Sequence, residues 1–221
     1  MLCILDYGSG NIKAFYNIYN QLDIEISVVS NSNELSKATK IILPGVGSFD
    51  SAINSLNQSG LRPKLEQLVL KNRVPVLGVC VGLQMMLEGS EEGSCDGLGW
   101  IKGKVMKFSQ KRGFEEESEN NYFSEKSLPR RSPQLPHMGW NKVKKIGNNE
   151  LIPNKKDLTF YFLHSYYVEP FEKNYSIAET EYDGLFCSAL CKDNIFGVQF
   201  HPEKSHSNGK VLLQNYAELK C

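Results

Sequence analysis

The chain has 221 residues, of which 25 are basic and 25 acidic, so its formal net charge at pH 7 is zero. This length suits one large domain or at most two small ones, and a hydrophobic content of 41% excludes a wholly disordered chain. Balanced charge provides no broad field for nucleic acid or an anionic membrane. The longest apolar stretch, residues 74–87, is interrupted by proline, glycine and glutamine, and no basic region precedes an apolar run at the start. We therefore expect neither a membrane span nor a secretory signal.

The first half of the chain alternates strand and helix signals. Short apolar or alternating runs predict strands at residues 2–5, 24–28, 40–43 and 74–79. Apolar residues at helical spacing predict helices at residues 12–22, 49–56 and 61–71. We expect the third strand to stop at Pro44-Gly45. Repeated βα units of this kind predict an α/β fold with a mostly parallel, twisted central sheet and helices on both faces.

The second half of the chain has a different pattern. Strand-like segments follow one another at residues 103–108, 158–163, 176–181, 186–191 and 195–200. Asp183-Gly184 and Asp193-Asn194 are turn signals between the last three segments, so we expect antiparallel hairpins added to the parallel core. Apolar spacing predicts a final helix at residues 211–219.

The segment Ser109–Leu135 differs from the rest because few of its residues are apolar and residues 115–119 form an acidic run. We expect a surface loop or a small flap inserted into the domain, because such a segment has little to bury in a core. A solvated insertion is the interpretation that we favour, and a partner-contact or specificity loop is the alternative.

The six cysteines argue against a disulfide framework. Cys3, Cys80 and Cys187 lie in apolar, strand-like runs, where a reduced thiol behaves as a small hydrophobe. No C-x2-C pair occurs, and no histidine pair lies near Cys187 and Cys191, which disfavours a zinc site. These features favour a reducing, cytoplasmic location.

The strongest local signal is Gly78-Val79-Cys80-Val81-Gly82, which follows an apolar strand and precedes a helical pattern. A nucleophile between glycines at a strand–turn–helix junction is typical of a nucleophile elbow, here with sulfur in place of oxygen. The tight turn projects the thiol from the sheet edge, and a helix N-terminus favours the thiolate, which is the attacking form. A buried core cysteine in an ordinary turn is the alternative that this motif alone leaves open.

A cysteine nucleophile needs a base, and the chain has four histidines. His201 comes at the end of a predicted strand, and Glu203 follows two residues later, where it can orient the imidazole. With Cys80, these residues form a candidate Cys–His–Glu triad. We expect the other histidines to be structural or site-lining (His137, His164) or solvated (His206).

Two glycine-rich turns follow predicted strands. Pro44-Gly45-Val46-Gly47 can present backbone N–H groups at the carboxyl edge of the sheet, where such donors, with the N–H of Val81, suit an oxyanion. An ordinary βα turn is the alternative. Gly8-Ser9-Gly10 lacks the third glycine and the acidic residue of a dinucleotide fingerprint, so we expect a structural turn and no nucleotide cofactor.

Taken together, the Cys80 elbow, His201-Pro202-Glu203 and Pro44-Gly45-Val46-Gly47 resemble the class I (triad) glutamine amidotransferases. Four further strings resemble one branch of this family, the glutaminase subunits of imidazole glycerol phosphate synthase; they are residues 6–11, 43–49, 136–141 and 200–205. The resemblance runs from residue 2 to about residue 219, apart from 109–135. It implies a single glutamine amidotransferase domain, residues 1–221, with the family's α/β fold and its added antiparallel section.

The resemblance also implies a role for each matching residue. Cys80 attacks the side-chain amide of glutamine to give a γ-glutamyl thioester and ammonia, while His201, oriented by Glu203, moves the protons. The oxyanion-hole donors are the N–H groups of Gly45, Val46 and Val81. In this family the 45–46 strand must shift before these donors can bind the oxyanion. The residues that bind glutamine are Gln84, Ser165 and Tyr166. No metal and no organic cofactor is implied.

In this branch the glutaminase docks on a (β/α)8-barrel cyclase subunit as a heterodimer, and glutamine hydrolysis is weak until the barrel is occupied. Ammonia passes through the barrel, which makes imidazole glycerol phosphate and aminoimidazole carboxamide ribotide in histidine biosynthesis. The alternatives are a paralogous glutaminase subunit that serves a similar synthase in a bacterial nucleotide-sugar pathway, a stand-alone cysteine hydrolase or peptidase, and a catalytically silent regulatory homologue.

Overall fold

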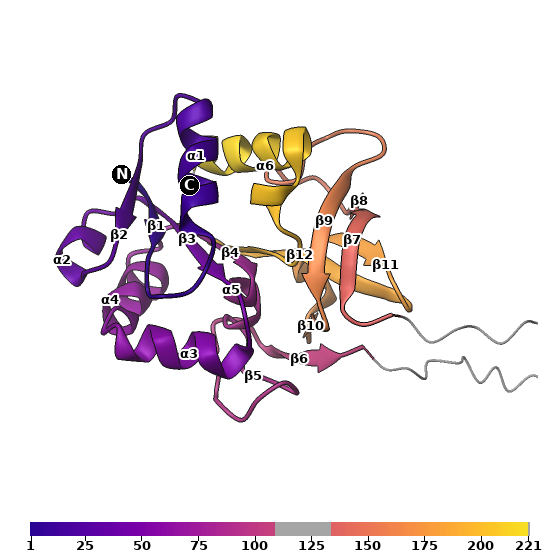
Figure 1. Ribbon diagram of the computed structural model, residues 1–221, viewed down its shortest axis with the longest axis horizontal. Helices are drawn as coiled ribbons and strands as arrows, with labels where there is room; N and C mark the ends of the chain where they lie inside the picture. The colour runs from indigo at the N-terminus through magenta and orange to yellow at the C-terminus, as the bar shows by residue number, and fades with distance from the viewer. Residues whose placement is uncertain (109–133, 221) are drawn as a thin grey trace, which may run out of the picture.

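The computed structural model describes residues 1–108 and 134–220 (Figure 1). Residues 109–133, most of the polar segment predicted at Ser109–Leu135, lie outside this range. The helices are α1 (Ile12–Gln21), α2 (Ser32–Leu35), α3 (Phe49–Gln58), α4 (Arg62–Glu66), α5 (Val81–Gln84) and α6 (His206–Glu218). A π-helical turn, Gln67–Lys71, follows α4, and two 3-10 turns span Lys173–Tyr175 and Pro202–Lys204.

Most strands belong to one large sheet with the neighbour order β2-β1-β3-β4-β13-β12-β10-β6-β5, while β11 pairs with β12 and β8. Its strands are β1 (Leu2–Leu5), β2 (Ile26–Val29), β3 (Lys40–Gly45), β4 (Val76–Cys80), β5 (Gly89–Ser90), β6 (Gly103–Lys107), β8 (Lys144–Lys145), β10 (Tyr166–Pro170), β11 (Ser176–Glu181), β12 (Leu185–Lys192) and β13 (Ile195–Val198). The pairs among β1, β2, β3, β4 and β13 are parallel, and those that β12 makes with β10, β11 and β13 are antiparallel. The predicted α/β fold with an added antiparallel section is therefore confirmed.

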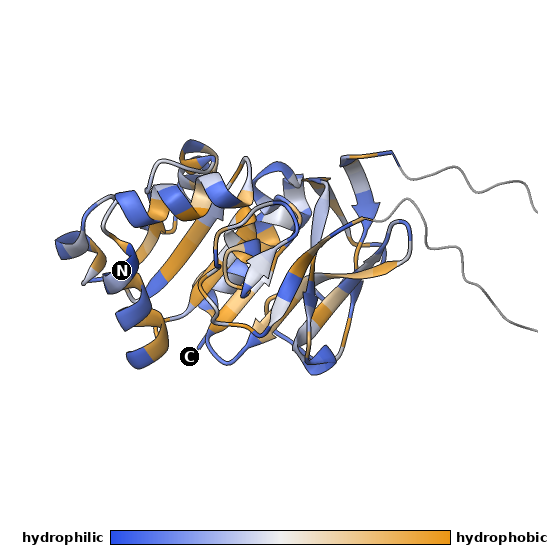
Figure 2. Ribbon diagram, turned by 90° about the horizontal axis from the view of Figure 1, so that it is seen from below, coloured by the Kyte–Doolittle hydropathy of each residue, from blue (hydrophilic) through white to orange (hydrophobic). Residues whose placement is uncertain are grey.

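The core lies between the parallel strands and the helices on the two faces of the sheet. Helices α1 and α6 pack together on one face, and α3 and α4 lie on the other (Figure 1). Strands β1 and β4 are buried along their whole length, and the apolar colour of the central strands is visible in Figure 2. Tyr216 of α6 is fully buried, and its hydroxyl donates to Ile41 O at 2.7 Å, which fixes the last helix against the sheet.

One predicted boundary is wrong in a way that matters for the site. Strand β3 does not stop at Pro44 but continues to Gly45, in parallel register with Val79 and Cys80 of β4. Proline is tolerated here because β1 pairs with β3 only as far as Ile42, so the missing N–H of Pro44 faces no strand on that side. Gly45 therefore lies directly beside Cys80.

Other elements also differ from the predictions. The helix expected at 61–71 changes to a π-helical turn after Glu66, and the last helix begins at His206 rather than near Val211. Strands β7 (His137–Lys142) and β9 (Thr159–His164) form a separate two-stranded antiparallel sheet. Within the described ranges, no helix is long and apolar enough to cross a membrane.

Candidate active site

The predicted elbow is present at the carboxyl end of β4. Cys80 has φ 55° and ψ −111°, a strained conformation for a residue with a side chain. The neighbouring glycines make the turn possible: a Cβ on Gly82 would lie 2.0 Å from Leu43 O, and one on Gly78 would lie 2.8 Å from Gly82 O. The helix that follows, α5, has only four residues. Its dipole is therefore a smaller source of thiolate stabilisation than the sequence pattern predicts.

His201 and Glu203 lie where a base and its orienting group are needed. His201 is buried and hydrogen-bonded to Cys80, and its Nδ1 is 2.8 Å from Glu203 Oε1. Burial lowers the pKa of His201, but the hydrogen bonds and negative charges of Cys80 and Glu203 outweigh it and raise the pKa to about 10. The imidazole is therefore held as an imidazolium at neutral pH.

The carboxylate of Glu203 is almost fully buried, with a side-chain exposure of 1%. One of its oxygens accepts from His201, while Oε2 has no hydrogen-bond partner among the described residues. The 3-10 turn at Pro202–Lys204 reverses the chain right after His201, so that a residue only two positions away can reach its Nδ1. A buried carboxylate of this kind stabilises positive charge on the imidazole strongly, because water does not screen the pair.

A cavity of about 380 Å³ opens beside Cys80. Its lining contains Val46, Gly47, Cys80, Val81, Gln84, Glu92, Pro136, Leu163, His164, Ser165, Tyr166, His201 and Lys204. Of the residues predicted for the site, Gly45 lies beside Cys80 in register without lining the cavity, and Glu203 reaches it only through His201. Ser165 joins β9 to β10 and Tyr166 begins β10, so both reach the cavity from the antiparallel part of the sheet.

Two charged lining residues, Glu92 and Lys204, were not predicted from the sequence. The carboxylate of Glu92 accepts from the N–H of Phe49 at 2.8 Å, at the start of α3. Asp50 fixes the same loop, because its carboxylate accepts from Ser94 N and Cys95 N, bonds that lower the pKa of Asp50. An anion and a cation in one cavity suit the α-ammonium and α-carboxylate of a free amino acid. In the sequence, Glu91 and Glu92 look like acidic residues of an ordinary solvated loop. No local signal therefore marks Glu92 as a residue of the site.

The predicted oxyanion donors are only partly available in this conformation. Val46 lines the cavity, but its N–H donates to Ser9 Oγ at 3.2 Å, and Ser9 Oγ in turn donates to Val46 O at 3.1 Å. Through these hydrogen bonds the turn at Gly8-Ser9-Gly10 holds the 45–46 segment. Before the Val46 N–H can face an oxyanion, its hydrogen bond to Ser9 must break.

The remaining histidines form a buried pair and one surface residue. His137 Nδ1 lies 3.0 Å from His164 Nε2, and His164 lines the cavity. Burial lowers the pKa of His137 to about 4 and that of His164 to about 3, so both are neutral at pH 7. His206 is exposed and stacks on Trp140, with ring centroids 5.1 Å apart.

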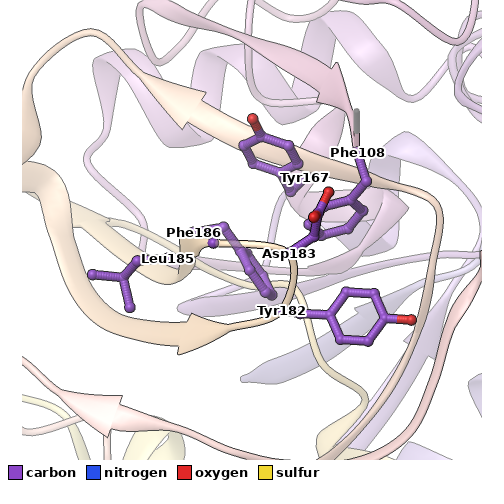
Figure 3. A pocket seen from close by; sticks show the side chains of 7 residues that line it. Phe108, Tyr167, Tyr182, Asp183, Leu185 and Phe186 are labelled. Carbon is purple, nitrogen blue, oxygen red and sulfur yellow. The ribbon is translucent and has the colours of Figure 1, made fainter. Parts of the chain in front are cut away.

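An aromatic cluster packs behind the histidine pair. The ring of Tyr182 stacks on His137 with centroids 3.8 Å apart, and Phe108 and Phe186 contact both histidines edge-on or tilted. The same side chains line a cavity of about 10 Å³ (Figure 3), which has room for one water molecule at most. This cluster therefore holds the pair in place rather than forming a second ligand site.

Comparison with known proteins gives consistent matches. A family model described as "Glutamine amidotransferase class-I" matches residues 3–218. The chain is 49% identical over 220 residues to the "Imidazole glycerol phosphate synthase subunit HisH" of Leptospira interrogans, covering 99% of this chain and 100% of that protein. Identity to the protein of the same name from Bdellovibrio bacteriovorus is 46%, with the same coverage.

Solved structures match at low sequence identity. A structure described as "Crystal structure of glutamine amidotransferase" has a TM-score of 0.69 and 14% identity, covering 98% of this chain and 97% of that one. "Structure of PurLQS from Thermotoga maritima" also has a TM-score of 0.69, at 15% identity, covering 98% of this chain and 96% of that one. At such identities these matches show the fold alone.

Proposed function

Since the chain belongs to the class I glutamine amidotransferase family, and within it to the HisH subunits of imidazole glycerol phosphate synthase, we propose that Cys80, His201 and Glu203 are its catalytic triad. The function is glutamine hydrolysis as the glutaminase subunit of this synthase, in histidine biosynthesis. The observation that supports the triad best is the buried His201–Glu203 pair, with its 2.8 Å contact, next to a cysteine in an elbow conformation.

Glutamine would occupy the 380 Å³ cavity with its side-chain amide at Cys80 and its α-ammonium at Glu92. The thiolate attacks the amide carbon, the oxyanion forms near the N–H groups of Val46 and Val81, and the His201 imidazolium protonates the leaving ammonia. Water, activated by the imidazole, then hydrolyses the γ-glutamyl thioester. Gln84, together with Ser165 and Tyr166, would hold the substrate. Residues 1–221 would act as one glutamine amidotransferase domain.

The partner in the synthase is a cyclase subunit, and we expect it to be a (β/α)8 barrel that receives the ammonia. Exposed apolar side chains gather around the cavity: Val46 and Leu163 line it, and Met138 and Trp140 lie on the strand next to Leu163, with exposures of 66% and 49%. Exposed apolar patches of this kind mark protein–protein contacts. The barrel would dock on this face, directly over Cys80.

The experiment that tests this proposal measures glutamine hydrolysis by the purified chain with and without the cyclase subunit and its ligand. Because the Val46 N–H is bound to Ser9, we expect a low rate for the chain alone and a rise of about a hundredfold or more in the loaded complex, the value typical of a gained oxyanion donor. If the histidine-pathway cyclase gave no stimulation, the proposal would fail. Stimulation only by a synthase of nucleotide-sugar metabolism would favour the paralogue, and peptide cleavage by the chain alone would favour a stand-alone hydrolase.

The Ser9→Ala variant tests the same mechanism without the partner. Loss of the hydroxyl frees the Val46 N–H, so basal hydrolysis by the chain alone should rise about fivefold, the equivalent of one ordinary hydrogen bond, and the stimulation by the cyclase should shrink by a similar factor. Ser36→Ala, which removes a hydroxyl that donates to Asn33 O near α2, is the matched control and should leave both rates unchanged. A basal rate in Ser9→Ala equal to that of the unmodified chain would show that this hydrogen bond does not limit the oxyanion hole.

A further inference from the structure

Gln199 is a fully buried polar residue next to the nucleophile. It follows β13, whose parallel register pairs Val198 with Val79, so Gln199 comes level with Cys80. Its side-chain Nε2 lies 3.8 Å from Cys80 Sγ, and its Oε1 lies 3.2 Å from Gln84 Nε2. Burying an amide side chain without hydrogen-bond partners costs free energy. The contacts with Cys80 and Gln84 are therefore the hydrogen bonds that satisfy the buried amide of Gln199.

The direction of these hydrogen bonds follows from the neighbouring groups. Gln84 Nε2 is 3.1 Å from Tyr166 O, which is a carbonyl and can only accept, so this end of Gln84 is its NH2 group. The same NH2 group faces Gln199, which must therefore present its oxygen to Gln84. The NH2 group of Gln199 is thus the end that faces the sulfur of Cys80.

The pair of His137 and His164 holds the Tyr166 carbonyl, which sets the direction of these hydrogen bonds. His164 Nδ1 is 2.8 Å from Tyr166 O, so it must carry the proton. Its Nε2 then accepts from His137 Nδ1, and His137 Nε2 accepts from Asn141 Nδ2 at 3.3 Å. Each side chain in this series of hydrogen bonds therefore has only one possible donor or acceptor role. The series begins at Asn141 and ends at Gln199, whose NH2 group faces the sulfur of Cys80.

We propose that Gln199 is a hydrogen-bond donor to the Cys80 thiolate in addition to His201, with its amide orientation set by Gln84 and the Tyr166 carbonyl. This role rests on the proposed function of Cys80 as the nucleophile. An N–H donor stabilises the charged sulfur more than the neutral thiol, since hydrogen bonds to ions are stronger than those between neutral groups. Gln199 adds this stabilisation without a charge of its own.

The test measures the alkylation rate of Cys80 in the full chain by iodoacetamide, read from the mass of the peptide that contains Cys80, as a function of pH. Gln199→Met keeps the length of the side chain but donates no hydrogen bond. We expect alkylation about tenfold slower than in the unmodified chain at pH 7, with the difference vanishing at alkaline pH, where the thiol ionises without help. Ser188→Ala, a buried hydroxyl on β12 with no described partner, is the control and should leave the profile unchanged.

A Gln199→Met profile equal to that of the unmodified chain, or slower by the same factor at every pH, would overturn the proposal, since mere disturbance of packing does not depend on thiol ionisation. A second measurement needs no Gln199 variant. In the nitrogen-15-labelled chain, one glutamine side-chain NH2 signal should shift with the ionisation of Cys80, and this shift should be absent in Cys80→Ala. If no glutamine amide followed the thiol, the proposal would also be overturned. Both measurements omit glutamine, so they stay separate from the test of the glutaminase function.

Discussion

Replacement of Cys80 by alanine should abolish glutamine-dependent synthesis by the complex, by about 10⁴-fold or more, while synthesis from added ammonia continues at the unmodified rate. The reason is that the thioester cannot form without the sulfur, whereas the cyclase chemistry takes place in the other subunit. The measurement compares product formation with glutamine and with ammonium salt as the nitrogen source, at the same concentration of complex.

The alanine variant should fold, because Cys80 contributes a small, buried side chain to the sheet edge. Cys191→Ala, a partly buried cysteine at the end of β12, is the control and should retain glutamine-dependent activity. Loss of the ammonia-dependent reaction in Cys80→Ala would mean that the complex no longer assembles, and retained glutamine-dependent turnover would show that Cys80 is not the nucleophile.

The second large effect is expected for Glu203→Gln, which keeps the shape of the side chain and removes its charge. The glutamine amide can present an N–H to His201 Nδ1 and force the wrong tautomer, so glutamine-dependent turnover should fall by about 10³-fold or more. The pKa of His201, raised to about 10 with the help of Glu203, should also fall. Because the imidazolium form protonates the leaving ammonia, the alkaline limb of kcat/KM for glutamine should move to lower pH.

The pH profile separates this role from a purely structural one. A change that only loosens the site would lower kcat/KM at every pH and leave the position of the alkaline limb unchanged. Glu179→Gln, at a strand position of β11, is the matched control and should change neither rate nor limb. An alkaline limb in Glu203→Gln at the same pH as in the unmodified complex would contradict the assignment of Glu203 as the residue that charges His201.

Much of the fold could be predicted because its signals are local. The apolar runs of the parallel strands, the helical spacing in α1 and the Asp183-Gly184 turn depend on neighbouring residues, and all three appear in the structure. The course of β3 through Pro44 could not be predicted, because the cost of a proline in a strand depends on which neighbour faces its missing N–H. That neighbour is known only from the tertiary fold.

The residues of the candidate site also fall into two groups, those with a local sequence signal and those without one. Cys80, His201 and Glu203 could be found because the elbow is a short motif and the acid lies two residues from the histidine. Glu92 and Gln199 could not be found without the structure, since each reaches the site through contacts with residues far away in the chain, Phe49 and Cys80. A glutamine inside an apolar run has no local signal that distinguishes a space-filling role from a donor to a thiolate.

The most direct test of the central claim is labelling with a diazoketone analogue of glutamine, which alkylates the atom that attacks the substrate. The loaded complex is treated with the analogue, and the peptides are analysed by mass spectrometry while the loss of glutamine-dependent activity is followed. We expect a single label on the peptide that contains Cys80, which accumulates in step with inactivation and is blocked by excess glutamine. Inactivation with Cys80 unmodified, or a label that forms on another residue in step with the loss of activity, would contradict the account.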